Sequence, residues 1–190
     1  MRPKSGIRTW EEWVAFAKRK GTVTVGGIGT VNVDFIQHQM LAEKAGYKIK
    51  YVPYNEEGQV LTSLLSGALD AAVSNPAEVL GQVRAEKLTP LLFTGKEPLK
   101  ALPDVPTGEA KGYTGLPSLP RGLILAPNVP DDVRQWWIDT MKKLVVTPAW
   151  KRYLQQNALT EDVRWGPDFE RYLNDTTSKL EKTLKEQGAI

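Results

Sequence analysis

The chain has 190 residues, of which 41% are hydrophobic and 25% are charged, a composition typical of a globular protein. It contains no cysteine and one histidine, His38, which excludes disulfides, thiolate metal sites and sites built from several histidines. The net charge is +3, but residues 1–20 alone carry +4, so no broad basic footprint for nucleic acid extends along the rest of the chain. We therefore expect no metal, no cofactor and no nucleic-acid partner.

The sequence shows neither of the usual targeting patterns. No apolar run approaches the roughly 18 residues that a membrane-spanning helix needs. The basic N-terminus, MRPKSGIRTWEEW, is not followed by an apolar stretch, so it does not have the pattern of a secretory signal. We expect either a cytoplasmic protein or a mature or shortened form of a longer one.

Helix and strand patterns alternate along the first part of the chain. Thr9 and Glu12 have the spacing of a capping box, which predicts a helix that begins at residue 10. Gly46 and Gly67 predict the ends of two further helices, because glycine readily adopts the left-handed backbone that closes a helix. The expected elements are helix 10–20, strand 22–27, helix 33–45, strand 47–54, helix 60–66, strand 68–74 and helix 76–87.

Two further apolar segments, LTPLLFTG (88–95) and GLILAP (122–127), predict buried strands. Strands joined by connections of helical length favour an α/β fold, a mainly parallel sheet flanked by helices. From Pro130 onward the pattern is helical only. We divide the chain into an N-terminal helix (1–20), an α/β lobe (21–127) and a C-terminal helical segment (128–190). The tryptophans fall mostly on helical apolar stripes, and we interpret them as core residues.

The sharpest candidate site is VTVGGIGTVNVDF, residues 23–35. A strand end, a glycine turn and a helix start gather free backbone amides at the positive end of a helix dipole. The third glycine of a dinucleotide fingerprint and the Gly-Lys-Ser/Thr of a P-loop are both missing, which favours a carboxylate over a nucleotide. A plain turn in which Asn32 or Asp34 caps the helix would explain the same residues. Asp34 and His38 could form a local hydrogen bond, a catalytic pair or part of a metal site.

Polar residues also follow the next two predicted strands. Tyr54 and Asn55 end the second strand, and Ser74 and Asn75 end the third. Ligands of open α/β sheets bind at the carboxyl ends of adjacent strands, so three loops converge on one candidate site. Each of these residues could also be a helix cap. Arg121 precedes an apolar segment, where it would either pair with a carboxylate or reach solvent.

Several strings resemble the substrate-binding proteins of tripartite tricarboxylate transporters, the Bug-type extracytoplasmic solute receptors. They are VTVGGIGTVNVDF, YVPYNEEGQVLTSLLSGALDAAVSNPAEV, ALPDVPT and RGLILAPNVP, in the family's order. The resemblance covers the chain from about Thr9 onward. It implies a two-lobed periplasmic-binding-protein fold of type II, no enzymatic activity and a periplasmic location. It also implies a membrane permease as partner and a small organic carboxylate, such as a di- or tricarboxylate or an aromatic acid, as ligand in an interlobe cleft.

The resemblance also implies which residues contact the ligand. They lie in the glycine loop, in the turn at Glu56–Gly58, at the end of the third strand and at the start of the last apolar segment. The ligand-binding residues expected are Gly27, Gly29, Thr30, Asn32, Asp34, Tyr54, Ser74, Asn75 and Arg121. Val31 and Phe35 depart from the family pattern, which commonly has a glycine at the first position and a polar residue near the second.

Family members continue further at the N-terminus, with a signal peptide and most of the first lobe. By resemblance, this chain therefore contains one complete lobe and C-terminal helices that return toward an incomplete first lobe. Half of a cleft predicts weak ligand binding or none. The alternative is a non-catalytic interaction module, in which the apolar faces of the incomplete lobe pair two copies into a homodimer.

Overall fold

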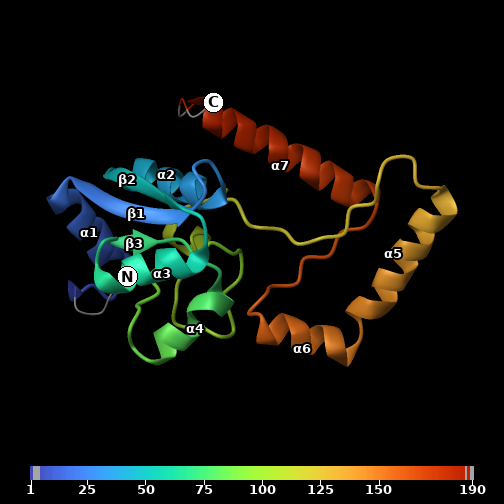
Figure 1. The fold of residues 1–190 in the computed structure, drawn as a ribbon, viewed down its shortest axis with the longest axis horizontal. Coiled ribbons are helices and arrows are strands. Elements are labelled where there is room, and N and C mark those ends of the chain that lie inside the picture. The colour runs from blue at the N-terminus through green and yellow to red at the C-terminus, as the bar shows by residue number, and fades with distance from the viewer. Residues whose placement is uncertain (2–4, 187, 189–190) are drawn as a thin grey trace.

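The computed structural model describes residues 1, 5–186 and 188, which form a small sheet covered by helices and joined to three further helices (Figure 1). We call residues 5–116 the lobe and residues 131–186 the arm. The elements of the lobe are α1 Trp10–Lys20, β1 Thr22–Ile28, α2 Val33–Ala45, β2 Lys48–Tyr54, α3 Glu57–Ser66, β3 Ala71–Ala72, α4 Pro76–Arg84 and the 3₁₀ helix η2 Glu109–Lys111. Those of the arm are α5 Asp131–Val145, α6 Pro148–Gln156 and α7 Pro167–Glu186.

The sheet confirms the α/β prediction. Its three strands are parallel in the order β2-β1-β3, so β1 is central. Ile28 pairs with Tyr54 and Gly26 with Ala72, which brings the carboxyl ends of all three strands to the same edge. β3 is shorter than the predicted strand 68–74, since only two of its residues pair.

Side chains alternate across the sheet and divide the lobe into two apolar layers. Val23 and Val25 point to one face, where they pack with Trp13 of α1 and Leu41 of α2. On the other face, α3 packs against residues of β2 and β3, with Leu69 buried between them. Only glycine fits at position 26, because a Cβ there would lie 2.6 Å from Leu69 Cδ1. Helices therefore cover both faces of the sheet.

Two predicted strands are absent from the described residues, so those predictions were wrong. Segment 88–95 makes a single parallel bridge, between Phe93 and Thr107. Segment 122–127 is irregular, and the side chain of Ile124 is 77% exposed. An apolar run indicates a tendency to be buried, but a strand also needs a neighbour to accept its backbone hydrogen bonds. No described strand of the sheet pairs with either segment.

The arm leaves the lobe along segment 117–130 and comes back to it at Ala158, which packs on Leu80 and Leu99 (Figure 1). Phe169, at the start of α7, lies over Gly122, where a Cβ would be 2.8 Å from the ring. No residue of α5, α6 or α7 is buried, although all of their residues are described.

The interpretation of the tryptophans as core residues is correct for Trp10 and Trp13, which are buried in the lobe. It is wrong for Trp136 and Trp137 of α5, whose side chains are 59% and 39% exposed. An amphipathic stripe predicts a face that needs a partner. Among the described residues, no such partner covers α5.

Candidate functional site at the carboxyl edge of the sheet

The glycine loop after β1 is held in place by β2. Gly29 donates its backbone amide to the Tyr54 carbonyl at 2.9 Å, and its own carbonyl accepts the Tyr51 hydroxyl at 3.1 Å. Gly29 has a φ of 70°, a left-handed conformation that glycine adopts without strain. Two of the predicted site residues, Gly29 and Tyr54, are therefore in direct contact.

The start of α2 uses two polar side chains to close this loop. Asn32 Oδ1 accepts the Phe35 amide at 3.1 Å, which makes Asn32 the N-cap. Asp34 Oδ2 accepts the Ile28 amide at 2.9 Å. The structure thus confirms the helix-cap interpretation for Asn32. Asp34 instead joins the first turn of α2 to the end of β1.

Free backbone donors remain in the same loop. None of the described residues accepts a hydrogen bond from the amides of Thr30, Val31 or Asn32. Thr30 and Val31 are exposed, and the loop leads into the positive end of the α2 dipole. These amides are the groups in this loop that could hold an anion.

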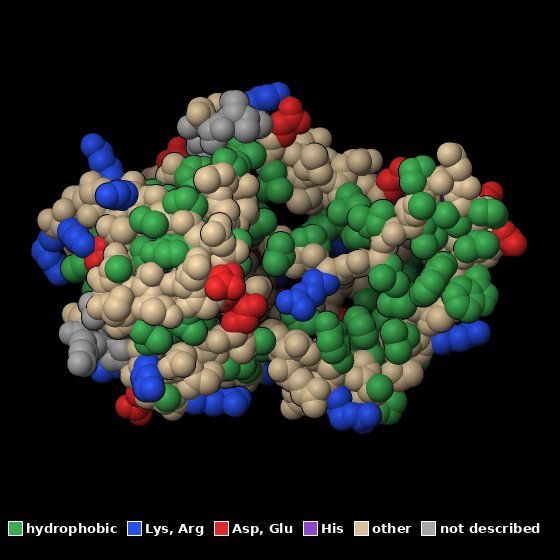
Figure 2. All heavy atoms as spheres, viewed as in Figure 1, with side chains coloured by type: hydrophobic (Ala, Val, Ile, Leu, Met, Phe, Trp, Pro, Cys, Tyr) green, Lys and Arg blue, Asp and Glu red, His purple; other side chains and the backbone are tan. Residues whose placement is uncertain are grey.

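Carboxylates from two other helices, Glu57 of α3 and Glu78 of α4, lie near Asp34, a proximity that the sequence does not predict. Burial raises the pKa of Asp34, and the charge of Glu78 raises it further. Burial likewise raises the pKa of Glu57, with smaller contributions from Glu78 and Asp34. The carboxyl edge of the sheet therefore carries three mutually repelling acidic groups, and Figure 2 shows acidic side chains gathered on the lobe where it faces the arm.

Ser74 and Asn75 contact these carboxylates. The Ser74 hydroxyl donates to Glu57 Oε1, and Asn75 Nδ2 donates to Glu78 Oε2 at 3.5 Å. Asn75 occupies the N-cap position of α4 but its side chain makes no capping bond. The two residues therefore lie at the predicted edge, where they hydrogen-bond to acidic neighbours.

Gly27 lies directly beside Asp34 and Tyr51. A Cβ at Gly27 would be 2.7 Å from Asp34 Oδ2 and 2.8 Å from the Tyr51 hydroxyl. The pKa of that hydroxyl is raised to about 12, chiefly by burial and also by the charge of Asp34. A glycine is thus required where the strand end, the aromatic ring and the carboxylate meet.

Asp34 and His38 bind different backbone groups rather than each other. His38 Nε2 lies 3.3 Å from the Gly26 carbonyl, and the ring is buried. Burial lowers the pKa of His38 to about 4, so the imidazole is neutral near pH 7. Among the described residues, no group of three or more histidine, aspartate or glutamate side chains is arranged to hold a metal ion.

Arg121 is exposed on segment 117–130, and no described contact joins it to the loops at the sheet edge. The structure therefore brings together the predicted residues of the three loops, whereas Arg121 belongs to the connection between the lobe and the arm.

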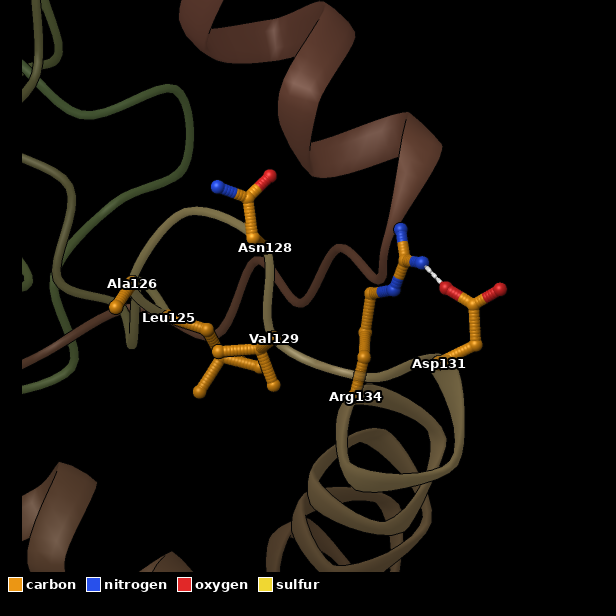
Figure 3. Close-up of a pocket in the computed structure, with 6 residues that line it drawn as sticks. All are labelled: Leu125, Ala126, Asn128, Val129, Asp131 and Arg134. Atoms are coloured by element: carbon orange, nitrogen blue, oxygen red, sulfur yellow. Dashed lines mark ion pairs between the residues drawn. The ribbon is translucent and has the colours of Figure 1, made fainter.

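Two hollows in the described parts of the chain lie elsewhere. One, of about 410 Å³, lies at the start of α5, where Asp131 and Arg134 form an ion pair (Figure 3). The other, of about 400 Å³, lies on α1 beside Lys111 and Tyr113. None of the predicted site residues lines either hollow. Neither of these two hollows therefore lies at the carboxyl edge of the sheet.

No helix in the described ranges is both long and apolar enough to cross a membrane.

Comparison with known proteins identifies relatives over nearly the whole chain. A protein from the TAR-I ttuE–ttuC′ intergenic region of Agrobacterium vitis is 29% identical over 186 residues, which cover 95% of this chain and 54% of the relative. A protein from the gbd 5′ region of Cupriavidus necator is 24% identical over 185 residues, which cover 97% of this chain and 56% of the relative. The chain therefore spans about half the length of these curated relatives.

Solved structures share the fold. A TctC solute-binding protein from Polaromonas superposes with a TM-score of 0.81 at 21% identity, over 98% of this chain and 64% of its own. A Rhodopseudomonas palustris protein with adipate has a TM-score of 0.79 at 17% identity, over 96% of this chain and 62% of its own. The MatC protein of the same organism, with bound malate, has a TM-score of 0.74 at 16% identity, over 96% and 64%.

The family model that describes tripartite tricarboxylate transporter family receptors, TctC, matches residues 1–189. This match confirms the resemblance seen in the sequence. The chain belongs to the TctC family of tripartite tricarboxylate transporter receptors.

Proposed function

We propose that this chain is part of the periplasmic solute-binding component of a tripartite tricarboxylate-type transporter, and that it binds a small organic carboxylate for delivery to a membrane permease. The unpartnered amides of Thr30, Val31 and Asn32 carry the proposal, because they lie together at the start of α2. Family membership supports it, as do the fold neighbours with adipate and malate. Binding would involve capture without chemistry.

The ligand would occupy one wall of a cleft. A formed small-molecule site buries most of its ligand, about 70–90% of the surface. The predicted residues instead line neither of the two hollows described above, and the chain spans 62% to 64% of these fold neighbours. We therefore expect this chain alone to bind carboxylates weakly, with a Kd on the order of 1 mM, or about 4 kcal/mol of binding free energy.

The acidic neighbours would weaken binding further. A ligand carboxylate at the loop amides would face the Asp34 carboxylate, and a like charge at about 4 Å costs about 1 kcal/mol even when water screens it. Asp34→Asn keeps an oxygen that can accept the Ile28 amide but removes the charge. We expect this variant to bind malate or adipate roughly three- to tenfold more tightly, the effect of that energy on a binding constant.

Backbone-amide NMR tests the proposal even when binding is weak. Titration with malate or adipate, against sodium chloride at equal ionic strength, should shift the amides of residues 29–35. Glu43→Gln, on the exposed far end of α2, is the matched control and should leave the affinity unchanged. Amide shifts confined to the basic residues of α1 would refute binding at the glycine loop. A submicromolar affinity would refute the expectation that this chain supplies only half of a cleft.

A further inference from the structure

The side chain of Tyr51 connects β2 to the glycine loop. Its hydroxyl donates a hydrogen bond to the Gly29 carbonyl at 3.1 Å. The Tyr51 ring packs edge to face against the rings of Phe35 and His38, with centroid distances of 5.3 and 6.2 Å. Burial raises the pKa of the hydroxyl to about 12, so it stays protonated and able to donate near neutral pH. The hydroxyl therefore has a fixed position and a defined acceptor.

The Gly29 carbonyl and the Thr30 amide belong to the same peptide group. A trans peptide is planar, and its C=O and N–H bonds point in opposite directions. No cis peptide bond occurs among the described residues. Because the Gly29 carbonyl points toward Tyr51, the Thr30 N–H points away from it, and Thr30 is exposed. The Tyr51 hydroxyl thus determines the direction of one of the three unpartnered amides of the loop.

The backbone freedom of Gly29 makes this restraint necessary. Glycine populates conformations that a Cβ would forbid, so the Gly29–Thr30 peptide can flip at little steric cost. A flipped peptide would present its carbonyl, an acceptor that repels an anion, where the Thr30 N–H now lies. The Gly29 amide donates to the Tyr54 carbonyl at 2.9 Å, but this bond fixes only the preceding peptide group. Among the described residues, Tyr51 is the one donor to the Gly29 carbonyl.

Gly27 provides the space in which the Tyr51 hydroxyl lies, because a Cβ at Gly27 would be 2.8 Å from that oxygen. We propose that Tyr51 is a positioning residue of the carboxylate site, whose hydroxyl holds the Gly29–Thr30 peptide so that the Thr30 amide faces the ligand. This inference rests on the proposed binding of a carboxylate at the loop amides. Tyr51 acts through the peptide group, since its hydroxyl lies on the side opposite the Thr30 N–H.

A Tyr51→Phe variant tests the proposal, because it removes the hydroxyl and keeps the ring that packs in the lobe. In backbone-amide NMR titrations we expect the affinity for malate to fall roughly two- to tenfold, the effect of one hydrogen bond on a binding constant. The ligand-induced shift of the Thr30 amide should be lost. Those of Val31 and Asn32, which belong to other peptide groups, should remain. A merely structural role of Tyr51 would not select one amide in this way.

Tyr47→Phe is the matched control. The Tyr47 hydroxyl also makes a hydrogen bond inside the lobe, where it accepts the Trp13 indole N–H at 3.3 Å. Tyr47 precedes Lys48, which pairs with Thr22 at the end of the sheet opposite the glycine loop. We expect Tyr47→Phe to leave the malate affinity and the Thr30 shift unchanged. An affinity that Tyr51→Phe also leaves unchanged would overturn the proposal.

The orientation of the peptide can also be measured without a ligand. The nuclear Overhauser effect between the Gly29 α-protons and the Thr30 amide proton depends on a distance that changes when the peptide flips. We expect its intensity to change in Tyr51→Phe and to stay constant in Tyr47→Phe. A constant intensity in Tyr51→Phe would overturn the proposal. Absence of malate binding by the native chain would instead refute the carboxylate site, and this measurement would then decide alone whether Tyr51 fixes the peptide.

Discussion

Asp34 accepts the Ile28 amide at 2.9 Å, so the first turn of α2 is fastened to the last residue of β1 across the glycine loop. The same carboxylate lies against Gly27, where a Cβ would be 2.5 Å from Asp34 Cβ. The conformation of the loop therefore depends on two residues: Gly27, which leaves room for Asp34, and Asp34, whose carboxylate accepts the Ile28 amide.

Gly27→Ala should destabilise the lobe, because the new methyl group would overlap Asp34 and Tyr51. Overpacking of this kind costs about 1–3 kcal/mol of unfolding free energy. Gly81→Ala is the control, since Gly81 lies inside α4 with nothing within 4 Å of its Cβ position. It should stabilise the chain by about 0.5–1 kcal/mol. Urea unfolding measures the change in unfolding free energy for each variant. Equal changes for the two substitutions would contradict the packing around Gly27.

Asn32→Ala should cost about 1 kcal/mol of unfolding free energy, because it removes the side-chain acceptor that caps α2. Asn75→Ala offers a comparison at another N-cap position, where the side chain makes no capping bond. We expect this second substitution to change stability by less than about 0.5 kcal/mol. Thermal unfolding of both variants checks the difference. Equal losses would mean that Asn75 also caps its helix.

Trp13→Ala should destabilise the lobe by about 3–5 kcal/mol, the usual cost of removing a large buried side chain. Trp13 is 2% exposed, and its indole Nε1–H donates to the Tyr47 hydroxyl at 3.3 Å. Trp137→Ala, on the open face of α5, should change the stability of the monomer by less than about 1 kcal/mol. Denaturant unfolding at low protein concentration measures the unfolding free energy of both variants. A large loss of unfolding free energy for Trp137→Ala would mean that the open face of α5 is buried in solution.

His38 should make the chain less stable as the pH falls. Burial lowers its pKa from the ordinary value of 6.5 to about 4 in the folded state. Between pH 6.5 and 4 the unfolded chain binds a proton that the folded chain does not, so stability declines across this window and changes no further below it. The loss is on the order of 3 kcal/mol.

A His38→Gln variant isolates this effect. The raised pKa values of Asp34 and Glu57 stabilise the folded state as the pH falls, which is the opposite direction, but both groups are present in either protein. The unfolding free energy of the native chain minus that of the variant should therefore fall as the pH is lowered from 6.5 to 4. Curves that remain parallel over this window would show that His38 is not buried as a neutral ring.

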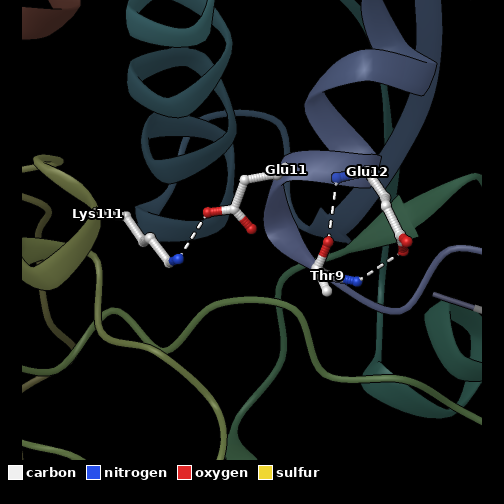
Figure 4. A network of polar contacts seen from close by, with 4 residues as sticks. All are labelled: Thr9, Glu11, Glu12 and Lys111. Atoms are coloured by element: carbon white, nitrogen blue, oxygen red, sulfur yellow. Dashed lines mark hydrogen bonds and ion pairs between the residues drawn. The ribbon is translucent and has the colours of Figure 1, made fainter.

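Features that depend on neighbouring residues could be predicted from the sequence. The capping box of α1 is present, with Thr9 Oγ1 accepting the Glu12 amide and Glu12 Oε2 accepting the Thr9 amide (Figure 4). Gly46 closes α2 with φ at 75°. Local hydrogen bonding and backbone preference decide these features, so a short stretch of sequence contains the necessary information.

Features that depend on distant partners could not be predicted in the same way. Glu57 and Glu78 begin different helices and approach Asp34 only because the parallel strand order brings their loops to one edge. The exposure of Trp137 depends on which surface, if any, covers α5. Helical periodicity shows that a face is apolar, but it does not identify the partner.

The two attachments of the arm have a mechanical consequence. The chain enters the arm along segment 117–130 and touches the lobe again at Ala158, while Phe169 rests on Gly122. α5 and α6 therefore lie in a loop of chain whose two ends are both held at the lobe. Moving α6 away from the sheet requires breaking the contact of Ala158 with Leu80 and Leu99.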